Sequence, residues 1–420
     1  MKPVRSLAQH LANFAIQTPD APALIAGGKT WSSRRLLAEA SHRAEQIAST
    51  SAPYMLQGSA LELAFHAYAC SVKNRVFWPV HRNIPDQGAL PAPDTALIIS
   101  TSGSEGQPKA VMLSHGNLDA AAIAANQRLP LGPGDCWLAC LPLYHIGGQS
   151  ILWRCAEAGA TVLLHDGFDA ALVASDFAGR TVTHISLVPA MLALLLDAGI
   201  KPPTSLRHAM IGGAALSKVL FERASRAGWP LNPSYGMSES AAQIATWTPA
   251  DGPWQEGLVG RALGDNELAI SEDGRIRLRG PQRMTGYLAA GCLDQGAWLT
   301  TGDLGKIDQH GRLTVTGRAD DMLISAGCNV HPLQVESCLA ACPGIRDIAV
   351  TGLPDSTWGD LVVALVVGSA TTDEVINWSK ARLPSAAQPR RIVHLTKLPR
   401  TPGGKLERSA LRQLAAGVKP

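Results

Sequence analysis

Apolar stretches that predict buried strands alternate with amphipathic stretches that predict helices along most of this chain. Short runs with the length and composition of buried strands occur at 96–99, 161–164, 184–188 and 208–211. Helical patterns occur at 61–72 and 190–196. This alternation favours an α/β fold, in which mainly parallel sheets are covered by helices.

The pattern changes after Gly260. Polar and apolar residues alternate in 267–270 and again in 275–279, on either side of Glu272-Asp273-Gly274, which predicts a half-exposed β-hairpin. A second hairpin is predicted across 308–311, leading into 313–316. We therefore expect a small hairpin-rich subdomain next to the helix-covered sheets.

A domain boundary is predicted just after Gly317-Arg318. Residues 1–318 would form the large N-terminal domain and residues 319–420 a small α+β domain. The second segment contains an amphipathic helical pattern at 332–341 and strand patterns at 348–350 and 361–367.

Composition excludes several classes of protein. The chain has 420 residues, 46% of them hydrophobic and 17% charged, with a net charge of +3, which is typical of a globular protein of more than one domain. No block of Lys and Arg indicates nucleic-acid binding, and no apolar run of about 18 residues indicates a membrane span. The first ten residues lack the apolar core of a signal peptide, so the expected location is the cytoplasm.

The eight cysteines are scattered, and the pairs Cys136/Cys140 and Cys338/Cys342 are four residues apart. This is not the Cys-x-x-Cys spacing of zinc sites. We expect buried, reduced thiols and no structural zinc.

The segment 100–109, Ser-Thr-Ser-Gly-Ser-Glu-Gly-Gln-Pro-Lys, carries the strongest chemical signal. Glycines let backbone N–H groups approach an oxyanion, hydroxyls add donors and Lys109 adds a charge, so this loop suits a polyphosphate. It is not a P-loop NTPase site, because Gly106 is followed by Gln-Pro-Lys and no Ser or Thr follows Lys109. The predicted phosphate-binding residues are Thr101, Ser102, Gly103, Ser104, Gly106 and Lys109.

The loop closely resembles the Thr-Ser-Gly-rich loop of the adenylate-forming superfamily, which includes acyl-CoA synthetases, luciferases and peptide-synthetase adenylation domains. Two positions depart from the usual pattern: Glu105 replaces a second Thr, and Ala110 replaces Gly. Neither change removes a glycine that the turn needs, and we expect Glu105 to point away from the triphosphate.

Further motifs of the superfamily follow in order. Gly212-Gly213-Ala214 follows a strand pattern and matches the adenine-binding segment. In Tyr235-Gly236-Met237-Ser238-Glu239, the resemblance makes the glutamate a Mg²⁺ ligand and Ser238 a phosphate contact, with the residues before them in the AMP site.

Toward the end of the chain, Thr301-Gly302-Asp303 and Arg318 match the residues that bind the ribose, and Asp320 matches the hinge between domains. The tail 399–406 resembles the Pro-Arg-Thr-x-x-Gly-Lys signature, which implies that Lys405 is the catalytic lysine.

The resemblance implies a two-step ligase with ATP and CoA as substrates and Mg²⁺ as the metal. The acid attacks the α-phosphate of ATP, pyrophosphate leaves, and Lys405 stabilises the charge that develops. A mobile C-terminal domain then rotates about Asp320, Gly327 lines a tunnel for the CoA thiol, and thioester formation releases AMP.

The acid is indicated by the segment 142–149, which resembles the acyl-pocket loop of the superfamily, with His145 at the position that gates the acid. Segments 149–154, 183–189 and 240–246 look most like o-succinylbenzoate–CoA ligases of menaquinone synthesis. That acid has a second carboxylate, for which Arg154 is the candidate partner; the alternative is an Arg154 that lies solvated on a helix surface. The predicted acid-binding residues are His145, Gly148, Gln149, Arg154 and Gly213.

Three alternatives stay open at this stage. The acid could be another fatty, aryl or dicarboxylic acid such as malonate. The acceptor could be the thiol of a carrier protein, although no carrier attachment site occurs in the chain. A homologue that only binds its ligand is disfavoured, because Glu239, Asp303, Arg318 and Lys405 are all present.

Overall fold

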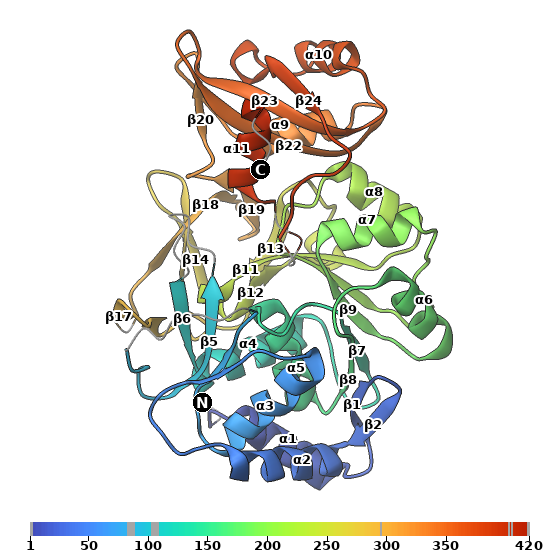
Figure 1. Cartoon of the computed structure of the whole chain (residues 1–420), viewed down its shortest axis with the longest axis vertical. Helices are drawn as coiled ribbons and strands as arrows, with labels where there is room; N and C mark the ends of the chain where they lie inside the picture. The colour runs from blue at the N-terminus through green and yellow to red at the C-terminus, as the bar shows by residue number, and fades with distance from the viewer. Residues whose placement is uncertain are drawn as a thin grey trace.

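The computed structural model describes residues 3–81, 89–101, 109–294, 296–401, 404 and 406–417. In Figure 1 the N-terminal helices lie at the bottom of the molecule, the large sheets fill the middle, and a small sheet with the C-terminal helices lies at the top.

The largest sheet in the described residues has thirteen strands in the order β14-β15-β18-β19-β13-β12-β11-β10-β9-β7-β8-β1-β2. Neighbours from β11 to β1 are parallel. These strands are β11 (Leu231–Met237), β10 (His208–Ile211), β9 (His184–Leu187), β7 (Cys136–Ala139), β8 (Thr161–Leu164) and β1 (Pro22–Ala26), and β2 (Lys29–Ser32) pairs antiparallel with β1.

Beyond β11 the sheet continues with antiparallel neighbours. The strands are β12 (Ala242–Thr246), β13 (Leu258–Ala262), β19 (Leu313–Arg318), β18 (Leu299–Ile307), β15 (Arg275–Arg279) and β14 (Glu267–Ile270). The two expected hairpins are therefore present. They extend the edge of the parallel strands, because β12 supplies hydrogen bonds on both sides, instead of forming a sheet of their own.

A second sheet has the order β17-β16-β6-β5-β4-β3, in which β3, β4 and β5 are parallel and the other neighbours are antiparallel. Its strands are β17 (Gly291–Cys292), β16 (Gly286–Tyr287), β6 (Lys109–Ser114), β5 (Thr95–Thr101), β4 (Phe77–Pro79) and β3 (Tyr54–Leu56).

Alternation along the strands decides which helices cover which face. Trp137 and Ala139 of β7 belong to a core shared with the second sheet and with helices α1 (Leu7–Gln17), α2 (Ser33–Gln46), α3 (Ala60–Val72), α4 (His115–Arg128) and α5 (Ile146–Ala158). Leu138, between them, faces the opposite core, which is covered by α6 (Ala170–Gly179), α7 (Pro189–Asp197) and α8 (Lys218–Arg226).

Helices α1 to α4 each begin after a serine. The hydroxyl groups of Ser6, Ser32, Ser59 and Ser114 accept hydrogen bonds from the backbone N–H three residues later, which satisfies one of the unpaired donors of each first turn.

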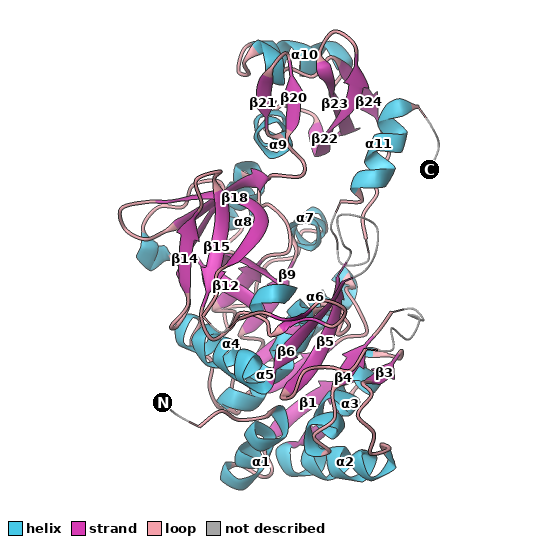
Figure 2. Ribbon diagram, turned by 90° about the vertical axis from the view of Figure 1, so that its left-hand side faces the viewer, coloured by secondary structure: helices cyan, strands magenta, loops and turns pink. Residues whose placement is uncertain are grey.

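The C-terminal sheet follows the order β21-β20-β23-β22, with β24 beside β23. Helices α9 (Pro332–Ala340) and α10 (Thr372–Lys380) pack on one face, and α11 (Arg408–Ala416) packs on the other (Figure 2). The strands are β20 (Leu323–Ser325), β21 (Cys328–Val330), β22 (Ile345–Asp355), β23 (Gly359–Gly368) and β24 (Arg391–His394).

The α/β fold class is confirmed, and most predicted elements end within a few residues of their expected bounds. The expectation for the cysteines is wrong at three positions. Cys292 and Cys328 are exposed and Cys338 is half-buried, because they lie on short edge strands and on a helix of the small sheet; the other five are buried, and all eight are free thiols. No helix in the described part of the chain is long and apolar enough to cross a membrane.

Candidate functional site

The candidate site lies where the carboxyl ends of β7, β9, β10 and β11 meet at one edge of the large sheet. Segments 140–149, 188–189, 212–214 and 238–239 follow these strands directly. Ligands of α/β sheets characteristically bind at such an edge, because the loops after neighbouring parallel strands converge there.

The predicted phosphate loop joins β5 to β6, as its sequence pattern indicated. Thr101 and Lys109 are paired across the two strands, and the Thr101 hydroxyl donates to the carbonyl oxygen of Lys109 at 3.3 Å. Ser102, Gly103, Ser104, Glu105 and Gly106 lie outside the described residues. Of the predicted phosphate loop, the structure therefore describes only the first and last residues, Thr101 and Lys109.

Glu239 is held by a residue that the sequence did not single out. Its Oε1 accepts a hydrogen bond of 2.9 Å from the Tyr287 hydroxyl, and the Nζ of Lys109 lies 5.7 Å from the centre of the same ring. Burial, followed by the charge of Glu239, raises the pKa of Tyr287, so the phenol stays protonated and donates. Tyr287 thus lies between the predicted metal ligand and the cation of the phosphate loop.

The arrangement fits a magnesium ion that arrives with a nucleotide. The other carboxylate oxygen of Glu239 has no partner among the described residues. No group of three His, Cys, Asp or Glu side chains suited to a metal occurs in the described part of the chain. Mg²⁺ commonly takes one or two carboxylates and completes its octahedron with substrate phosphates and water.

The predicted ribose-binding residues come together on β18 and β19. Asp303 lies opposite Arg318 in the strand register, with 3.5 Å between Asp303 Oδ1 and Arg318 Nη1. The Tyr235 hydroxyl donates to Asp303 Oδ2 at 2.8 Å, and Arg318 Nη2 lies 3.4 Å from Oδ2 of the predicted hinge residue, Asp320. Burial alone would lower the pKa of Arg318, but the carboxylates of Asp303, Asp321 and Asp320 raise it.

Val188, at the end of β9, lies next to two predicted site segments. A Cβ on Gly213 would lie 3.3 Å from Val188 Cγ1, and a Cβ on Gly404 would lie 2.6 Å from Val188 Cγ2. Lys405 lies outside the described residues. Its neighbour Gly404 nevertheless brings the tail segment to the strand edge that carries the candidate acid-binding residues.

Two of the predicted site glycines have a structural requirement of their own. A Cβ on Gly236 would collide with the Ala242 carbonyl on β12, and one on Gly148 would lie 2.8 Å from the Leu141 carbonyl oxygen. The missing side chain of Gly236 therefore lets β11 pack closely on β12, and that of Gly148 lets α5 pack closely on the loop before it.

The loop before α5 is held by Gln149. Its amide Nε2 donates to the Leu143 carbonyl at 2.7 Å, and the side chain is buried. His145 is the N-cap residue of α5, and its ring lies 4.8 Å from that of Tyr144. The direct contact of His145 and Gln149 with an acid stays a prediction.

Arg154 is buried, with 1% of its surface exposed, so the alternative of a solvated helix-surface residue is wrong. Its guanidinium carbon lies 5.3 Å from the Trp137 ring centre, and Nη1 lies 3.7 Å from Met210 Sδ. Within the described residues, Nε and Nη2 have no hydrogen-bond partner and no carboxylate pairs with the group. Burial lowers the pKa of Arg154 to about 10, which leaves it charged at pH 7.

Gly327 lies in the turn between β20 and β21 with a φ of +73°, and a Cβ there would meet no atom within 4 Å. Gly327 therefore lies in an open turn of the small sheet, and its role in a CoA tunnel stays a prediction.

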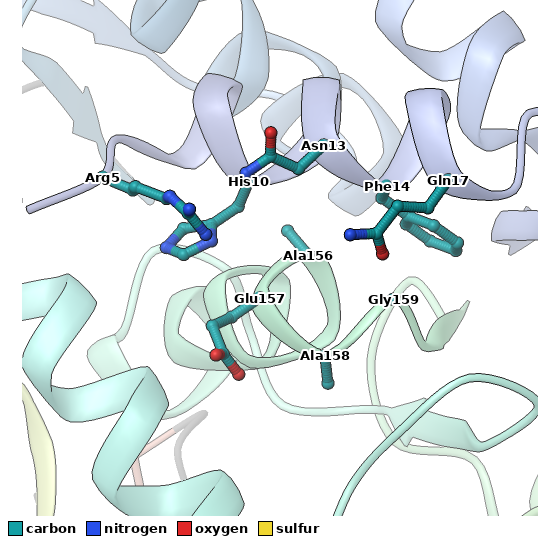
Figure 3. Close-up of a pocket in the computed structure, with 9 residues that line it drawn as sticks. All are labelled: Arg5, His10, Asn13, Phe14, Gln17, Ala156, Glu157, Ala158 and Gly159. Carbon is teal, nitrogen blue, oxygen red and sulfur yellow. The ribbon is translucent and has the colours of Figure 1, made fainter. Parts of the chain in front are cut away.

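A cavity of about 180 Å³ lies away from these residues, between α1 and the C-terminal end of α5. Figure 3 shows His10 and Arg5 on one side of this cavity and Glu157 on the other. Since none of the predicted site residues line it, it is separate from the candidate site.

Comparisons with known proteins identify the family of the chain. The family model described as AMP-binding enzyme matches residues 62–288, and the model described as AMP-binding enzyme C-terminal domain matches residues 334–405. The chain is 37% identical over 338 residues to a 2-succinylbenzoate–CoA ligase of Bacillus cereus, which covers 76% of this chain and 70% of that protein.

Among solved structures, the chain resembles o-succinylbenzoate CoA synthetase (MenE) from Bacillus subtilis in complex with the acyl-adenylate intermediate OSB-AMP. The TM-score is 0.86 at 28% identity, with coverage of 96% of this chain and 97% of that one. A double mutant of the same synthetase, bound to the product analogue OSB-NCoA, matches with the same identity and coverage but a TM-score of 0.68.

Proposed function

Because the chain belongs to the AMP-binding enzyme family, we propose that it is a 2-succinylbenzoate–CoA ligase of menaquinone biosynthesis. It uses ATP to convert the acid to an acyl-adenylate with release of pyrophosphate, and then transfers the acyl group to CoA with release of AMP. The observation that carries the choice of acid is the buried guanidinium of Arg154, whose Nε and Nη2 have no partner among the residues that the structure describes.

Adenylate formation needs the acid and ATP to be held in line while negative charge moves onto the pyrophosphate. Lys109 and the donors of the phosphate loop bind the phosphates, and Asp303 accepts hydrogen bonds from the ribose hydroxyls. Mg²⁺ bound at Glu239 would neutralise phosphate charge. Tyr287 keeps one Glu239 oxygen engaged, so that the other is available to the metal.

Arg154 distinguishes a dicarboxylic acid from a monocarboxylic one. One carboxylate of 2-succinylbenzoate reacts at the edge of the sheet, and the other enters the protein. A buried carboxylate is costly unless it is paired, and a guanidinium pairs with it through two parallel hydrogen bonds. The unpartnered Nε and Nη2 of Arg154 supply two such donors.

Thioester formation uses the second unit of the chain. We assign residues 1–318 to the part that binds ATP and the acid, and residues 319–420 to a C-terminal domain that rotates about Asp320. The tail beside Val188 and the higher TM-score to the acyl-adenylate complex support an adenylate-forming arrangement of the present structure. After rotation, Lys405 would leave the acid and Gly327 would line the path of the CoA thiol. A cytoplasmic location stays a prediction.

The test is to supply purified protein with ATP, Mg²⁺, CoA and a panel of acids, and to measure AMP release. We expect CoA-dependent release with 2-succinylbenzoate at a higher kcat/KM than with benzoate, malonate or a fatty acid. Preference for one of the other acids would reject the proposed substrate and keep the ligase. Transfer to a carrier-protein thiol but not to CoA would change the acceptor.

Arg154→Met tests the assignment of the second carboxylate. We expect kcat/KM for 2-succinylbenzoate to fall about 100-fold, since a charged hydrogen-bonded pair inside the protein is lost, and kcat/KM for benzoate to change little. The exposed Arg34→Met is the matched control. An equal loss on both acids would remove Arg154 from substrate recognition.

A further inference from the structure

We propose that Trp137 is a specificity-determining residue that acts through Arg154: its indole ring holds the guanidinium in the acid pocket without neutralising it, ready for the second carboxylate of the substrate. This inference rests on the proposed function and assigns a role to a residue that the catalytic motifs do not include.

The indole itself is fixed. Trp137 has 1% of its surface exposed, and its Nε1–H donates to the Ser186 hydroxyl at 3.1 Å on the neighbouring strand β9. Its ring stacks on that of His184, with centres 4.9 Å apart and planes at 26°. Turning the indole would break the hydrogen bond and the stack, so its π face is a rigid surface.

In the described part of the chain, the Arg154 guanidinium lies beside an aromatic ring and a thioether sulfur and forms no ion pair with a carboxylate. The face of Trp137 attracts the cation, and the Met210 sulfur lies against Nη1. A fixed Asp or Glu would have occupied the planar fork of donors. An aromatic face attracts the charge from above the plane and leaves the in-plane donors Nε and Nη2 unoccupied.

His184 does not add a second cation beside Arg154. Burial, followed by the neighbouring His208, lowers the pKa of His184 to about 3, so the ring is neutral at pH 7. The positive charge in this layer therefore belongs to Arg154 alone among the described groups that contact Trp137.

The depth of this layer suits the proposed acid. Ser186 lies opposite Met210 in the parallel register, and two residues further along the same strands are Val188 and Gly212 at the sheet edge. Two residues of a strand rise about 7 Å. A succinyl carboxylate that reacts at the edge and the ring carboxylate at the other end of the four-carbon chain can therefore reach the edge and the Arg154 layer together.

The test compares two acids in Trp137→Leu and Trp137→Phe. The acids are 2-succinylbenzoate and 4-oxo-4-(2-methylphenyl)butanoate, in which a methyl group replaces the ring carboxylate and the reacting succinyl carboxylate is kept. In Trp137→Leu we expect KM for the diacid to rise about tenfold, kcat to stay unchanged, and KM for the monoacid to change less than about twofold. In Trp137→Phe, which keeps a weaker π face, we expect a rise of about threefold for the diacid.

Trp229→Leu is the matched control. It removes another buried indole, from the core on the opposite face of the sheet, so it carries a similar packing cost without contacting Arg154. The ratio of the two KM values should stay at the wild-type level in this variant.

An equal rise of KM for both acids in Trp137→Leu would show a packing role and overturn the inference. If that variant does not fold, Trp137→Phe decides, and an unchanged KM ratio overturns the inference. Failure of the proposed function is distinguished from failure of this inference, because in that case the wild-type enzyme itself would not prefer the diacid over the monoacid. If Arg154→Met loses the preference while Trp137→Leu keeps it, only the role of Trp137 is rejected.

Discussion

At the scale of single residues, the partners of a side chain decide what it can do. Glu239 belongs to a motif, but the group that orients it, Tyr287, lies 48 residues further along the chain. Sequence spacing gives no signal for that contact. It arises because β16 pairs with β6, which brings Tyr287 close to both Glu239 and Lys109.

Tyr287→Phe should weaken magnesium binding while leaving the fold intact. The ring that Lys109 approaches is kept, but the hydrogen bond to the Glu239 carboxylate is lost. We expect the Mg²⁺ concentration for half-maximal ATP–pyrophosphate exchange to rise about tenfold. Mn²⁺ binding in the presence of ATP, followed by electron paramagnetic resonance, should weaken to the same extent.

Tyr54→Phe, remote from Glu239 in the second sheet, is the control and should leave both measurements unchanged. An unaltered metal requirement in Tyr287→Phe would mean that Glu239 does not need this hydrogen bond for its position.

Burial of the neutral His184 ring should make the stability of the protein depend on pH. Its pKa is lowered to about 3 by burial and by His208, against an ordinary value of 6.5 in the unfolded chain. Unfolding therefore takes up a proton below pH 6.5, so stability is full above pH 6.5 and falls as the pH drops toward 3. The slope is about 1.4 kcal/mol per pH unit for this group.

Thermal denaturation at pH 7 and pH 5 measures this slope. In His184→Phe, which keeps a ring to stack on Trp137, the difference in melting temperature between the two pH values should shrink. The exposed His310→Ala should keep the wild-type difference. If the melting temperatures at pH 7 and pH 5 differ as much in His184→Phe as in the wild type, His184 is not the source of the pH dependence.

At the scale of elements, Gly236 in the strand pair β11–β12 is required for packing and is also predicted to bind the nucleotide. Gly236 stands in the motif predicted to bind the nucleotide, yet its first requirement is the close approach of the Ala242 backbone. Sequence analysis gave this glycine a role in the nucleotide site, because the approach of β12 is a property of the folded pair alone.

Gly236→Ala should destabilise the protein even without ATP. The added methyl group meets backbone, which cannot move aside like a side chain, so we expect a cost of about 3 kcal/mol and a lower melting temperature. Gly132→Ala is the control, since a Cβ there meets nothing within 4 Å. A Gly236→Ala protein as stable as wild type, with weaker ATP binding alone, would reverse this interpretation.

At the scale of the whole molecule, the C-terminal unit contacts the large sheet at two described places. Gly404 approaches Val188 at the edge of the large sheet, and Ser337 of α9 donates to Glu256 Oε1 at 2.8 Å. These contacts join the small sheet and its helices to the segments around the site.

Lys405→Ala should separate the two half-reactions. If Lys405 stabilises the developing charge as proposed, loss of this cation should slow adenylate formation by about two to three orders of magnitude. Thioester formation from the acyl-adenylate supplied ready-made should survive, because Lys405 would by then have left the acid. Quenched-flow measurement of each half-reaction checks this, and an equal loss in both would contradict the rotation of the C-terminal domain.

The sequence by itself determined the family, the α/β fold class and the order of the elements. These properties depend on short stretches of sequence. The apolar run before the phosphate loop, the motif from Tyr235 to Glu239 and the tail signature each lie within about ten residues. The family resemblance is confirmed by the matches to residues 62–288 and 334–405.

Only the tertiary structure decided that Arg154 is buried with no ion-pair partner in the described part of the chain, that its guanidinium lies over the Trp137 ring, and that the Tyr287 hydroxyl donates to Glu239. Each of these facts depends on the register between strands that are far apart in sequence. An arginine in a helix has the same local sequence whether it meets water or a sheet, so its burial arises only when α5 packs on β7 and β10.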